Sequence, residues 1–514
     1  MTQTIQESND ARLRHVVSST ADRHVPISPF SGEVISGVDL SSIDDVAVAV
    51  QRARIAQEQW VSTSWAKRSA IFAKYHDLVL DRQDEILDVI QRETGKARGQ
   101  AMEEIFHVAM NAIYLAHNGK KILATDKRPG LFPILTSTHV HQVPKGVVGV
   151  ITPWNYPFTL AISDALAALF AGNTVVIKPD LQTMWSAIVA VDLLVEAGLP
   201  EGAATIVVGD GVTLGTALID AVDYVCFTGS TATGRVVGAR VASRLVGASL
   251  ELGGKNPMIV LEDADLNKAM DICVHACFTS AGQLCVSTER IYVARTIYDK
   301  FIQQLISRVS GLRLEARLGW GYDVGSMTTA AQLDRTAASV ARAVEQGAQV
   351  LVGGRKRPDI GPLVFEPTIL ADVSPDADIA RQEVFGPVVF VTPFDTVDEA
   401  IDSANDTPYG LSASVITRDT SRGRAIAKKI RSGSVSINEG FGATFGSVSS
   451  PMGGMGDSGL GRRHGPEGVL RFTEPQTISV QRLVTVGPQF ELSDAQWVRW
   501  MTRALKALKT LRIR

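Results

Sequence analysis

One cysteine of the sequence, Cys285, lies in a setting that suits a nucleophile. It closes the segment Ala281–Cys285 (AGQLC), in which a glycine bend can leave the thiol exposed at a helix edge. A helix N-terminus or a cation nearby would then lower the pKa of this thiol and make it reactive. An isolated cysteine is more often a small buried apolar residue, so this segment alone leaves both interpretations open.

Two other cysteines have a different pattern. Cys273 and Cys277 are four residues apart, on one face of an expected helix, with His275 between them. A metal site would need further ligands at matching spacing, and the sequence offers none. We interpret both cysteines as core residues and predict no metal site.

Two segments supply a candidate base and a candidate oxyanion donor. Glu251 stands in an apolar run and is followed by two glycines, and burial in a cleft would raise its pKa toward the range of a general base. The alternative is a salt-bridged carboxylate at a strand end. Asn155 is held between Pro153 and Pro157, where its amide could donate to a developing oxyanion. The alternative is an ordinary turn with aromatic packing.

Glycine-rich turns offer a place for phosphate groups. Phe227–Gly234 (FTGSTATG) joins an expected strand to an expected helix, where glycines let backbone N–H groups approach a phosphate. Gly209, Gly211 and Gly215 form a looser turn upstream. Neither turn has the G-x-G-x-x-G pattern, so each is a weak signal by itself.

The elements that would position these residues alternate between strands and helices. Residues 41–105 have helical periodicity, and two α/β series follow, before and after Glu251. Apolar strands followed by helices predict parallel sheets, which bind ligands at the carboxyl ends of their strands. Expected strands are 146–152, 174–178, 204–208, 224–228, 259–261, 290–293, 350–352, 388–392 and 414–417; expected helices are 158–170, 185–197, 266–280, 297–308 and 328–345.

Composition narrows the class of protein. The 514 residues suggest two to four domains at roughly one per 150 residues, and 45% hydrophobic with 20% charged residues is typical of a globular chain. A net charge of −3 gives no basic excess for nucleic acid. Four cysteines favour free thiols in a reducing cytoplasm. Residues 1–25 are expected to form a loose polar arm without a signal peptide, and no apolar stretch predicts a membrane span.

Taken together, these segments resemble the aldehyde dehydrogenase superfamily. They occur in the family's order and approximate spacing, and the likeness runs from about Ser28 to Gln481. Further matching segments are Asn173–Pro179 (NTVVIKP), Glu383–Pro387 (EVFGP), Pro408–Leu411 (PYGL) and Pro451–Arg462 (PMGGMGDSGLGR).

The resemblance implies an architecture of two parallel-sheet α/β domains and a small β flap. It implies an NAD(P)-binding domain at 26–122 and 145–253, and a catalytic domain at 254–460. Residues 123–144 and 471–482 would form an oligomerisation flap whose edge strands need a partner. A homodimer or a homotetramer is expected.

The resemblance also assigns roles. Cys285 would attack the aldehyde, Asn155 and the Cys285 N–H would hold the oxyanion, and Glu251 would activate water to hydrolyse the thioester. Lys178 would contact the adenosine ribose, Gly229 and Ser230 the pyrophosphate, and Glu383 the nicotinamide ribose. The whole expected cofactor set is Trp154, Asn155, Lys178, Pro179, Asp180, Leu181, Gly211, Gly215, Gly229, Ser230, Thr233, Leu252, Glu383 and Phe385.

One departure from the family concerns the cofactor. Many NAD-preferring members have a glutamate where this chain has Leu181, three residues after Lys178. Without that acid, repulsion against a 2′-phosphate is removed and Lys178 could pair with the phosphate. We therefore expect NADP, with NAD also usable, although the nearby Asp180 argues the other way.

A second departure concerns the substrate. The chain most resembles bacterial NADP-dependent succinate-semialdehyde dehydrogenases, whose members use arginines to hold the substrate carboxylate. Ser163 and Thr279 occupy the two arginine positions here, so a less polar aliphatic or aromatic aldehyde is the alternative. Two other functions compete: a CoA-acylating dehydrogenase, against which Glu251 argues, and a non-catalytic scaffold.

The third departure is a C-terminal extension, residues 490–514. Its apolar residues fall on one helical stripe, and no acid follows Asp494. This is typical of a basic amphipathic helix that lies on a membrane surface, and equally of a helix docked on its own or a neighbouring subunit. The stripe is Trp497, Trp500, Met501, Ala504, Leu505, Leu508 and Leu511; the basic residues are Arg499, Arg503, Lys506, Lys509, Arg512 and Arg514.

Overall fold

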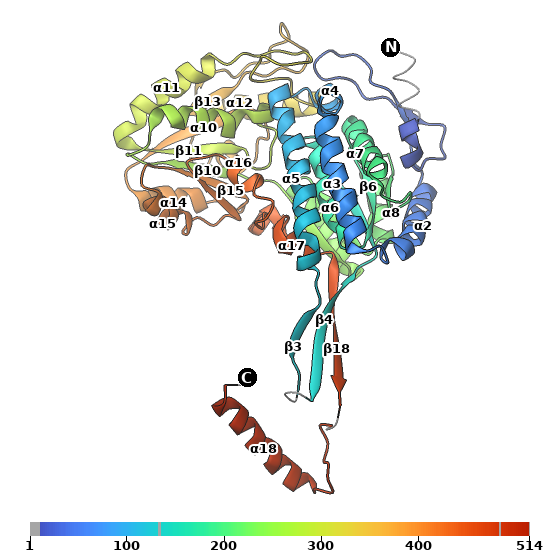
Figure 1. Cartoon of the computed structure of the whole chain (residues 1–514). Coiled ribbons are helices and arrows are strands. Elements are labelled where there is room, and N and C mark those ends of the chain that lie inside the picture. The colour runs from blue at the N-terminus through green and yellow to red at the C-terminus, as the bar shows by residue number, and fades with distance from the viewer. Residues whose placement is uncertain (1–10, 132–134, 483–484, 513–514) are drawn as a thin grey trace. The chain divides into compact units, whose positions relative to one another are not determined.

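A computed structural model describes residues 11–131, 135–482 and 485–512 (Figure 1). The chain forms two compact units. The larger unit comprises Met1–Ile122 and Pro144–Phe472, and the smaller one Leu123–Val143 and Thr473–Arg514. Both α/β series lie in the larger unit, which confirms the predicted α/β fold class with two parallel-dominated sheets.

The first sheet has six strands in the order β17-β9-β8-β5-β6-β7. Strands β5 to β9 pair in parallel, and β17 runs antiparallel to β9. Every residue of β5, β6 and β8 is buried, as expected of parallel strands covered by helices. The strands are β5 (Val147–Ile151), β6 (Thr174–Lys178), β7 (Ala204–Ile206), β8 (Tyr224–Thr228), β9 (Gly247–Glu251) and β17 (Gly459–Leu460); their helices are α6 (Pro157–Phe170), α7 (Met184–Ala197), α8 (Thr213–Ala221) and α9 (Thr231–Ser243).

The second sheet has seven strands in the order β12-β13-β14-β11-β10-β15-β16, with β12 antiparallel to β13 and the other pairs parallel. Two of its strands, β13 and β16, were not predicted. Four residues give no clear periodic signal, and the equally short β12 was expected only from the apolar run 350–352. The strands are β10 (Asn256–Val260), β11 (Thr288–Ala294), β12 (Gln349–Val352), β13 (Thr368–Ala371), β14 (Val388–Phe394), β15 (Ser412–Ile416) and β16 (Ser434–Ile437); their helices include α10 (Leu266–Phe278), α11 (Tyr298–Ser310), α12 (Ala330–Glu345), α14 (Val397–Asn405) and α15 (Thr420–Ala427).

Four helices near the N-terminus pack around the first sheet: α2 (Ile43–Trp60), α3 (Trp65–Asp81), α4 (Gln83–Thr94) and α5 (Arg98–Ile122). The interpretation of residues 1–25 as a loose arm is wrong for residues 11–25, while residues 1–10 lie outside the described residues. Arg12 and His15 are buried, and each lies 3.1 Å from the carboxylate of Asp192 on α7. The charged residues that suggested a free arm are satisfied by this carboxylate.

The smaller unit contains a three-stranded sheet, in the order β18-β4-β3, and the helix α18 (Asp494–Thr510). The strands are β3 (Asp126–Pro129), β4 (Thr136–Pro144) and β18 (Thr473–Gln481). Strand β18 is exposed after its first residue, including Ile478 and Val480. No helix among the described residues is long and apolar enough to cross a membrane.

A buried cluster of charges fixes α6, the helix that follows Asn155. Asp164 on α6 is paired with two arginines: Arg463 Nε and Nη2 lie 3.1 and 2.9 Å from its carboxylate oxygens, and Arg471 Nη2 lies 2.5 Å away. All three side chains are buried. Burial alone would raise the pKa of Asp164, but the two guanidinium groups lower it overall.

We expect Asp164→Asn to destabilise the fold, because it leaves two buried guanidinium ions without their counter-charge. Breaking a buried pair in this way costs about 3–5 kcal/mol. Urea unfolding followed by fluorescence measures the loss. Asp220→Asn is the control, because its partner Arg240 is exposed and the unfolding midpoint should barely move. An Asp164→Asn midpoint equal to that of the control would contradict this account.

Candidate active site

A cavity of about 660 Å³ lies between the two sheets of the larger unit. One wall comes from the ends of β8 and β9 and the turn before α6, and the other from the segment before β11, from α12 and from the turn before β14. Cys285, Glu251 and Asn155 all line it. The structure thus brings together the three residues that were predicted separately as nucleophile, base and oxyanion donor.

The backbone before Cys285 is strained and closely packed. Ser280 and Ala281 adopt φ angles of 53° and 52°, in the left-handed region that L-residues rarely occupy. Gly282 has φ +69°, and a Cβ there would lie 2.1 Å from the carbonyl oxygen of Gly386. Only glycine fits this position, so the sharp bend that presents Cys285 to the cavity depends on it.

Asn256, the first residue of β10, holds the cysteine backbone, and Gly254 shortly before it leaves room for this contact. The Asn256 side-chain Nδ2 donates to the Cys285 carbonyl oxygen at 2.7 Å and to the Ser287 carbonyl oxygen at 2.8 Å. A Cβ at Gly254 would lie 2.7 Å from the Cys285 carbonyl oxygen, so this residue also has to be glycine. The ELGGKN segment therefore carries Glu251 and also seats the nucleophile.

The Cys285 thiol is half-buried, and its pKa is raised to about 12. Burial is the main cause, and the negative charges of Glu383 and Glu251 add to it. The expectation that a helix N-terminus or cation lowers this pKa is therefore wrong, because burial and the charges of the two carboxylates outweigh the opposing charge of Arg463. The thiol needs a proton acceptor before it can attack.

Glu251 ends β9 and faces the cavity with an unpaired oxygen. Its backbone is fixed by the Gly229 N–H, which donates to the Glu251 carbonyl oxygen at 3.1 Å, and by pairing with Gly459 of β17. Its Oε1 is buried without a hydrogen-bond partner among the described residues. Burial raises the pKa of Glu251 to about 7, against the opposing charges of Arg463 and Arg471, as the sequence predicted. A carboxylate of this kind can exchange protons near neutral pH.

Asn155 is tied directly to the cysteine segment. Its Nδ2 donates to the backbone carbonyl oxygen of Gln283 at 3.0 Å, two residues before Cys285. Its side chain is buried, and its Oδ1 has no hydrogen-bond partner among the described residues. One N–H of the amide is therefore held, and the other remains for an oxygen bound beside Cys285.

Glu383 and Phe385 form the opposite wall. Glu383 Oε1 accepts from the Gly254 N–H at 3.0 Å, and burial raises the pKa of Glu383 to about 8. Phe385 has φ 54° and meets Trp154 edge-on, with ring centroids 5.5 Å apart. The Glu289 carboxylate holds this turn by accepting from the Val384 and Phe385 N–H groups at 3.0 and 2.9 Å.

The residues predicted to bind the cofactor fall into two groups. Trp154, Asn155, Gly229, Ser230, Leu252, Glu383 and Phe385 line the cavity. The others do not line it: Lys178 ends β6, and Pro179, Asp180 and Leu181 follow it; Gly211 and Gly215 lie after β7, and Thr233 lies in the first turn of α9. Burial lowers the pKa of Lys178, and the charges of both Asp180 and Asp210 act against this. The turns after β6 and β7 therefore lie close together.

An elongated dinucleotide fits this arrangement. The cavity accepts one end beside Cys285, where Glu251 Oε1 and Asn155 Oδ1 are buried without partners. Ser230 caps α9 by accepting from the Thr233 N–H at 3.2 Å, which puts a helix N-terminus on the cavity wall. The turns after β6 and β7, at the carboxyl edge of the same sheet, remain for the other end.

An apolar cluster packs against the thiol. Cys285 and Phe445 pack on Tyr156, Leu160, Leu284, Val286, Leu411, Phe441 and Met452.

Ser163 is buried in α6, and its Oγ lies 3.2 Å from Nδ1 of His107. His107 lies 2.8 Å from His464, and burial lowers the pKa of both, the latter to about 3. Ser163 and these two uncharged histidines therefore offer no cation here.

Sequence reasoning missed the residues that hold the site in place. Gln332 on α12 donates from Nε2 to the Val384 and Phe385 carbonyl oxygens, both at 2.9 Å. Lys96 donates to the Asn155 carbonyl oxygen at 2.6 Å. Their types are ordinary for a helix face and a loop, so no local pattern marks them.

Comparison with known proteins agrees with this geometry. The model of the aldehyde dehydrogenase family matches residues 16–478. A Mycolicibacterium smegmatis protein named "Putative succinate-semialdehyde dehydrogenase [NADP(+)]" is 45% identical over 505 residues, which are 98% of this chain and 98% of that protein.

Two solved structures are similar over most of their length. An E. coli NADP-dependent enzyme has a TM-score of 0.87 and 32% identity, over 90% of this chain and 96% of that chain. A Bacillus cereus aldehyde dehydrogenase, solved as its NAD+ complex, has a TM-score of 0.86 and 30% identity, over 92% of this chain and 98% of that chain.

The chain therefore belongs to the aldehyde dehydrogenase family. It is an oxidoreductase, and its substrate class is the small-molecule aldehyde.

Proposed function

We propose that this chain oxidises an aldehyde to a carboxylic acid through a thioester on Cys285, with NADP as its preferred cofactor. The observation that carries the proposal is that Cys285, Glu251 and Asn155 line one and the same cavity. In it, Glu251 Oε1 and Asn155 Oδ1 are buried without hydrogen-bond partners among the described residues. The family's domain division is proposed with it: cofactor domain at 26–122 and 145–253, catalytic domain at 254–460.

Cys285 and Asn155 each have one task, and Glu251 has two. Glu251 takes the thiol proton, and the Cys285 sulfur bonds to the aldehyde carbon, so that the carbonyl oxygen becomes an oxyanion. Asn155 Nδ2 and the Cys285 N–H donate to that oxyanion. The nicotinamide, when bound, supplies the acceptor for a hydride. Loss of the hydride turns the carbon bound to sulfur into a thioester carbon, and Glu251 releases the first proton to solvent. Glu251 then takes a proton from water as the water oxygen attacks the thioester carbon. The C–S bond breaks, the acid leaves, and the proton on Glu251 passes to the sulfur to restore the thiol.

The same wall residues would hold the cofactor. We assign the pyrophosphate to Gly229 and Ser230 at the N-terminus of α9, and the nicotinamide ribose to Glu383. NADP is favoured because Leu181 brings no carboxylate, and because Asp180 is already used as a cap: its Oδ1 accepts from the Gln182 N–H at 2.9 Å. The M. smegmatis relative named above also carries NADP(+) in its name.

Succinate semialdehyde is the first candidate substrate, because it is the substrate in the name of the M. smegmatis relative. The second candidate is an apolar aliphatic or aromatic aldehyde. It is favoured by the apolar cluster beside Cys285 and by Ser163 and Thr279, which are both buried and carry no positive charge.

The pKa of Glu251, about 7, predicts the pH dependence of turnover. Only the carboxylate accepts a proton, so kcat should fall about tenfold per pH unit below pH 7. Glu251→Gln should lower kcat by about 10²–10⁴-fold and remove this limb. Glu315→Gln, at an exposed carboxylate paired with Arg317, is the matched control and should change neither. An unchanged pH limb in Glu251→Gln would contradict the role of Glu251.

A substrate and cofactor panel tests the rest of the proposal. We expect kcat/KM with NADP to exceed that with NAD by at least about tenfold, a difference of about 1.4 kcal/mol. A large preference for NAD would refute the cofactor assignment.

Succinate semialdehyde, hexanal and benzaldehyde distinguish the substrate classes by their kcat/KM values. Product analysis with and without CoA shows whether the acyl group passes to water or to CoA. No NAD(P)H formation with any aldehyde would support a non-catalytic scaffold.

The smaller unit would carry the assembly and membrane contacts. We propose a homodimer or homotetramer, since the exposed edge strand β18 needs a partner.

We also propose that α18 attaches the enzyme to an anionic membrane surface. Arg499, Arg503, Lys506 and Lys509 are basic, and Trp500 and Leu505 are exposed. Trp497, at the start of the predicted stripe, is buried and donates to the Val486 carbonyl oxygen at 2.7 Å, so it packs on its own chain; Arg514 lies outside the described residues.

We expect the full chain to sediment with phosphatidylserine vesicles at low salt and to be released at high salt, because each basic residue near the surface contributes about 1 kcal/mol. The double variant Lys506→Glu/Lys509→Glu and a chain ending at residue 490 should both bind less than the full chain. Neutral phosphatidylcholine vesicles should bind none of the three proteins. Equal partitioning of all three proteins would rule out membrane attachment. If the chain ending at residue 490 instead differs from the full chain in oligomer size on gel filtration, α18 docks on a neighbouring subunit.

A further inference from the structure

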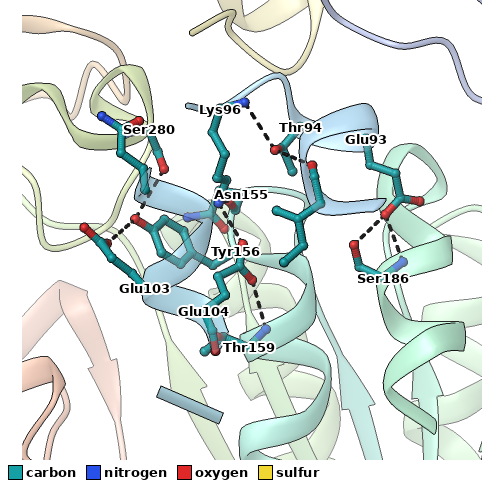
Figure 2. Close-up of polar contacts among 12 residues, drawn as sticks. Glu93, Thr94, Lys96, Glu103, Glu104, Asn155, Tyr156, Thr159, Ser186 and Ser280 are labelled. Carbon is teal, nitrogen blue, oxygen red and sulfur yellow. Dashed lines mark hydrogen bonds and ion pairs between the residues drawn. The ribbon is translucent and has the colours of Figure 1, made fainter. Parts of the chain in front are cut away.

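A buried ion pair lies behind Asn155, outside the set of residues assigned to the reaction. Lys96, in the loop between α4 and α5, donates from Nζ to Glu104 Oε1 at 2.8 Å and to the Asn155 backbone carbonyl oxygen at 2.6 Å (Figure 2). The same Nζ lies 3.7 Å from the centroid of the Tyr156 ring. An ammonium group has three donors, so each finds an acceptor here.

Glu104 uses its second oxygen on the helix that follows Asn155. Glu104 Oε2 accepts from the Thr159 N–H at 2.9 Å. Helix α6 begins at Pro157, and its own N-cap residue, Tyr156, provides no side-chain cap. The first N–H groups of a helix need acceptors, and a negative charge is favourable at that end. Glu104 therefore caps α6 from the neighbouring helix α5.

These contacts hold both sides of the turn that carries Asn155. Lys96 holds the carbonyl of Asn155 itself, and Glu104 holds the helix two residues after Pro157. The Asn155 side chain is at the same time bonded to the Gln283 carbonyl oxygen beside Cys285. A shift of this turn would move the amide away from the carbonyl oxygen of a substrate on Cys285, and small misplacements are expensive in catalysis.

We propose that Lys96 and Glu104 are positioning residues that fix the Asn155 amide for the oxyanion. This proposal rests on the proposed role of Asn155. Stability alone is a weak reason for such a pair, because a buried ion pair can often be replaced by neutral side chains without loss. The contact of Nζ with the Asn155 carbonyl gives the pair a task that a neutral replacement would not perform.

The test is a double-mutant cycle on the rate of the first hydride transfer, followed as a single turnover of NADPH formation. Lys96→Met/Glu104→Gln removes both charges while Gln keeps an oxygen for the Thr159 N–H. Asn155→Ala should slow the step by about 10²–10³-fold. The charge-free pair should slow it at least tenfold in the wild-type background and less than threefold in the Asn155→Ala background, because its effect passes through that amide.

Glu93→Gln is the matched control. Glu93 is another buried carboxylate that caps a helix. It accepts from the Ser186 N–H of α7 at 2.9 Å (Figure 2) and from the Trp185 N–H at 2.7 Å. It makes no hydrogen bond to Asn155. Glu93→Gln should lower the melting temperature without changing the single-turnover rate, so that a loss of stability is distinguished from a loss of positioning.

The outcomes separate the two proposals. Independent, multiplicative losses for the pair and for Asn155→Ala would overturn the positioning role of Lys96 and Glu104. An unchanged rate in Asn155→Ala would instead refute the oxyanion role of Asn155. If Lys96→Met/Glu104→Gln does not fold, the cycle is run with Lys96→Met alone, which leaves the Glu104 cap in place, and the same two criteria apply.

Discussion

The hydrogen bond from Asn155 Nδ2 to the Gln283 carbonyl oxygen joins the two halves of the active site. Asn155 belongs to the turn between β5 and α6 of the first sheet, and Gln283 to the segment that leads into β11 of the second. The chemistry needs a thiol from one side and an amide from the other within reach of one substrate oxygen. Because the link is short and buried, small movements of either half would change that geometry.

Desolvated carboxylates dominate the electrostatics around this link. Burial raises the pKa of Glu251 to about 7 and that of Glu383 to about 8, and both charges raise the pKa of the Cys285 thiol. Glu289 is compensated differently, by Lys255 at 2.5 Å and by two backbone N–H groups. The site thus uses the Glu289 carboxylate as a structural anchor. It leaves Glu251 with a pKa near neutral pH, so that this carboxylate can take and return protons.

Much of this arrangement could be predicted from sequence. Most strands of both sheets followed from short apolar runs. Cys285, Glu251 and Asn155 were singled out by the glycines and prolines beside them, and the resemblance to the family then assigned their roles. Strands β9, β13 and β16 escaped. β13 and β16 have only four residues each, and the sequence of β9, GASLE, contains no continuous apolar run. The raised pKa of Cys285 also escaped, because it depends first on burial and then on the charge of Glu383, which is 98 positions away in sequence and comes near only in the fold. Lys96 escaped for the same reason: nothing local shows that a loop lysine ends beneath the Asn155 carbonyl.

The account depends most on a covalent bond to one sulfur. Acid quenching within a single turnover, followed by mass spectrometry of the digested protein, tests it directly with an aldehyde and NADP. The account predicts that the peptide containing Cys285 gains the mass of the acyl group, and that Cys285→Ser neither gains it nor turns over. Undiminished turnover by Cys285→Ser, or an adduct on a different residue, would contradict it.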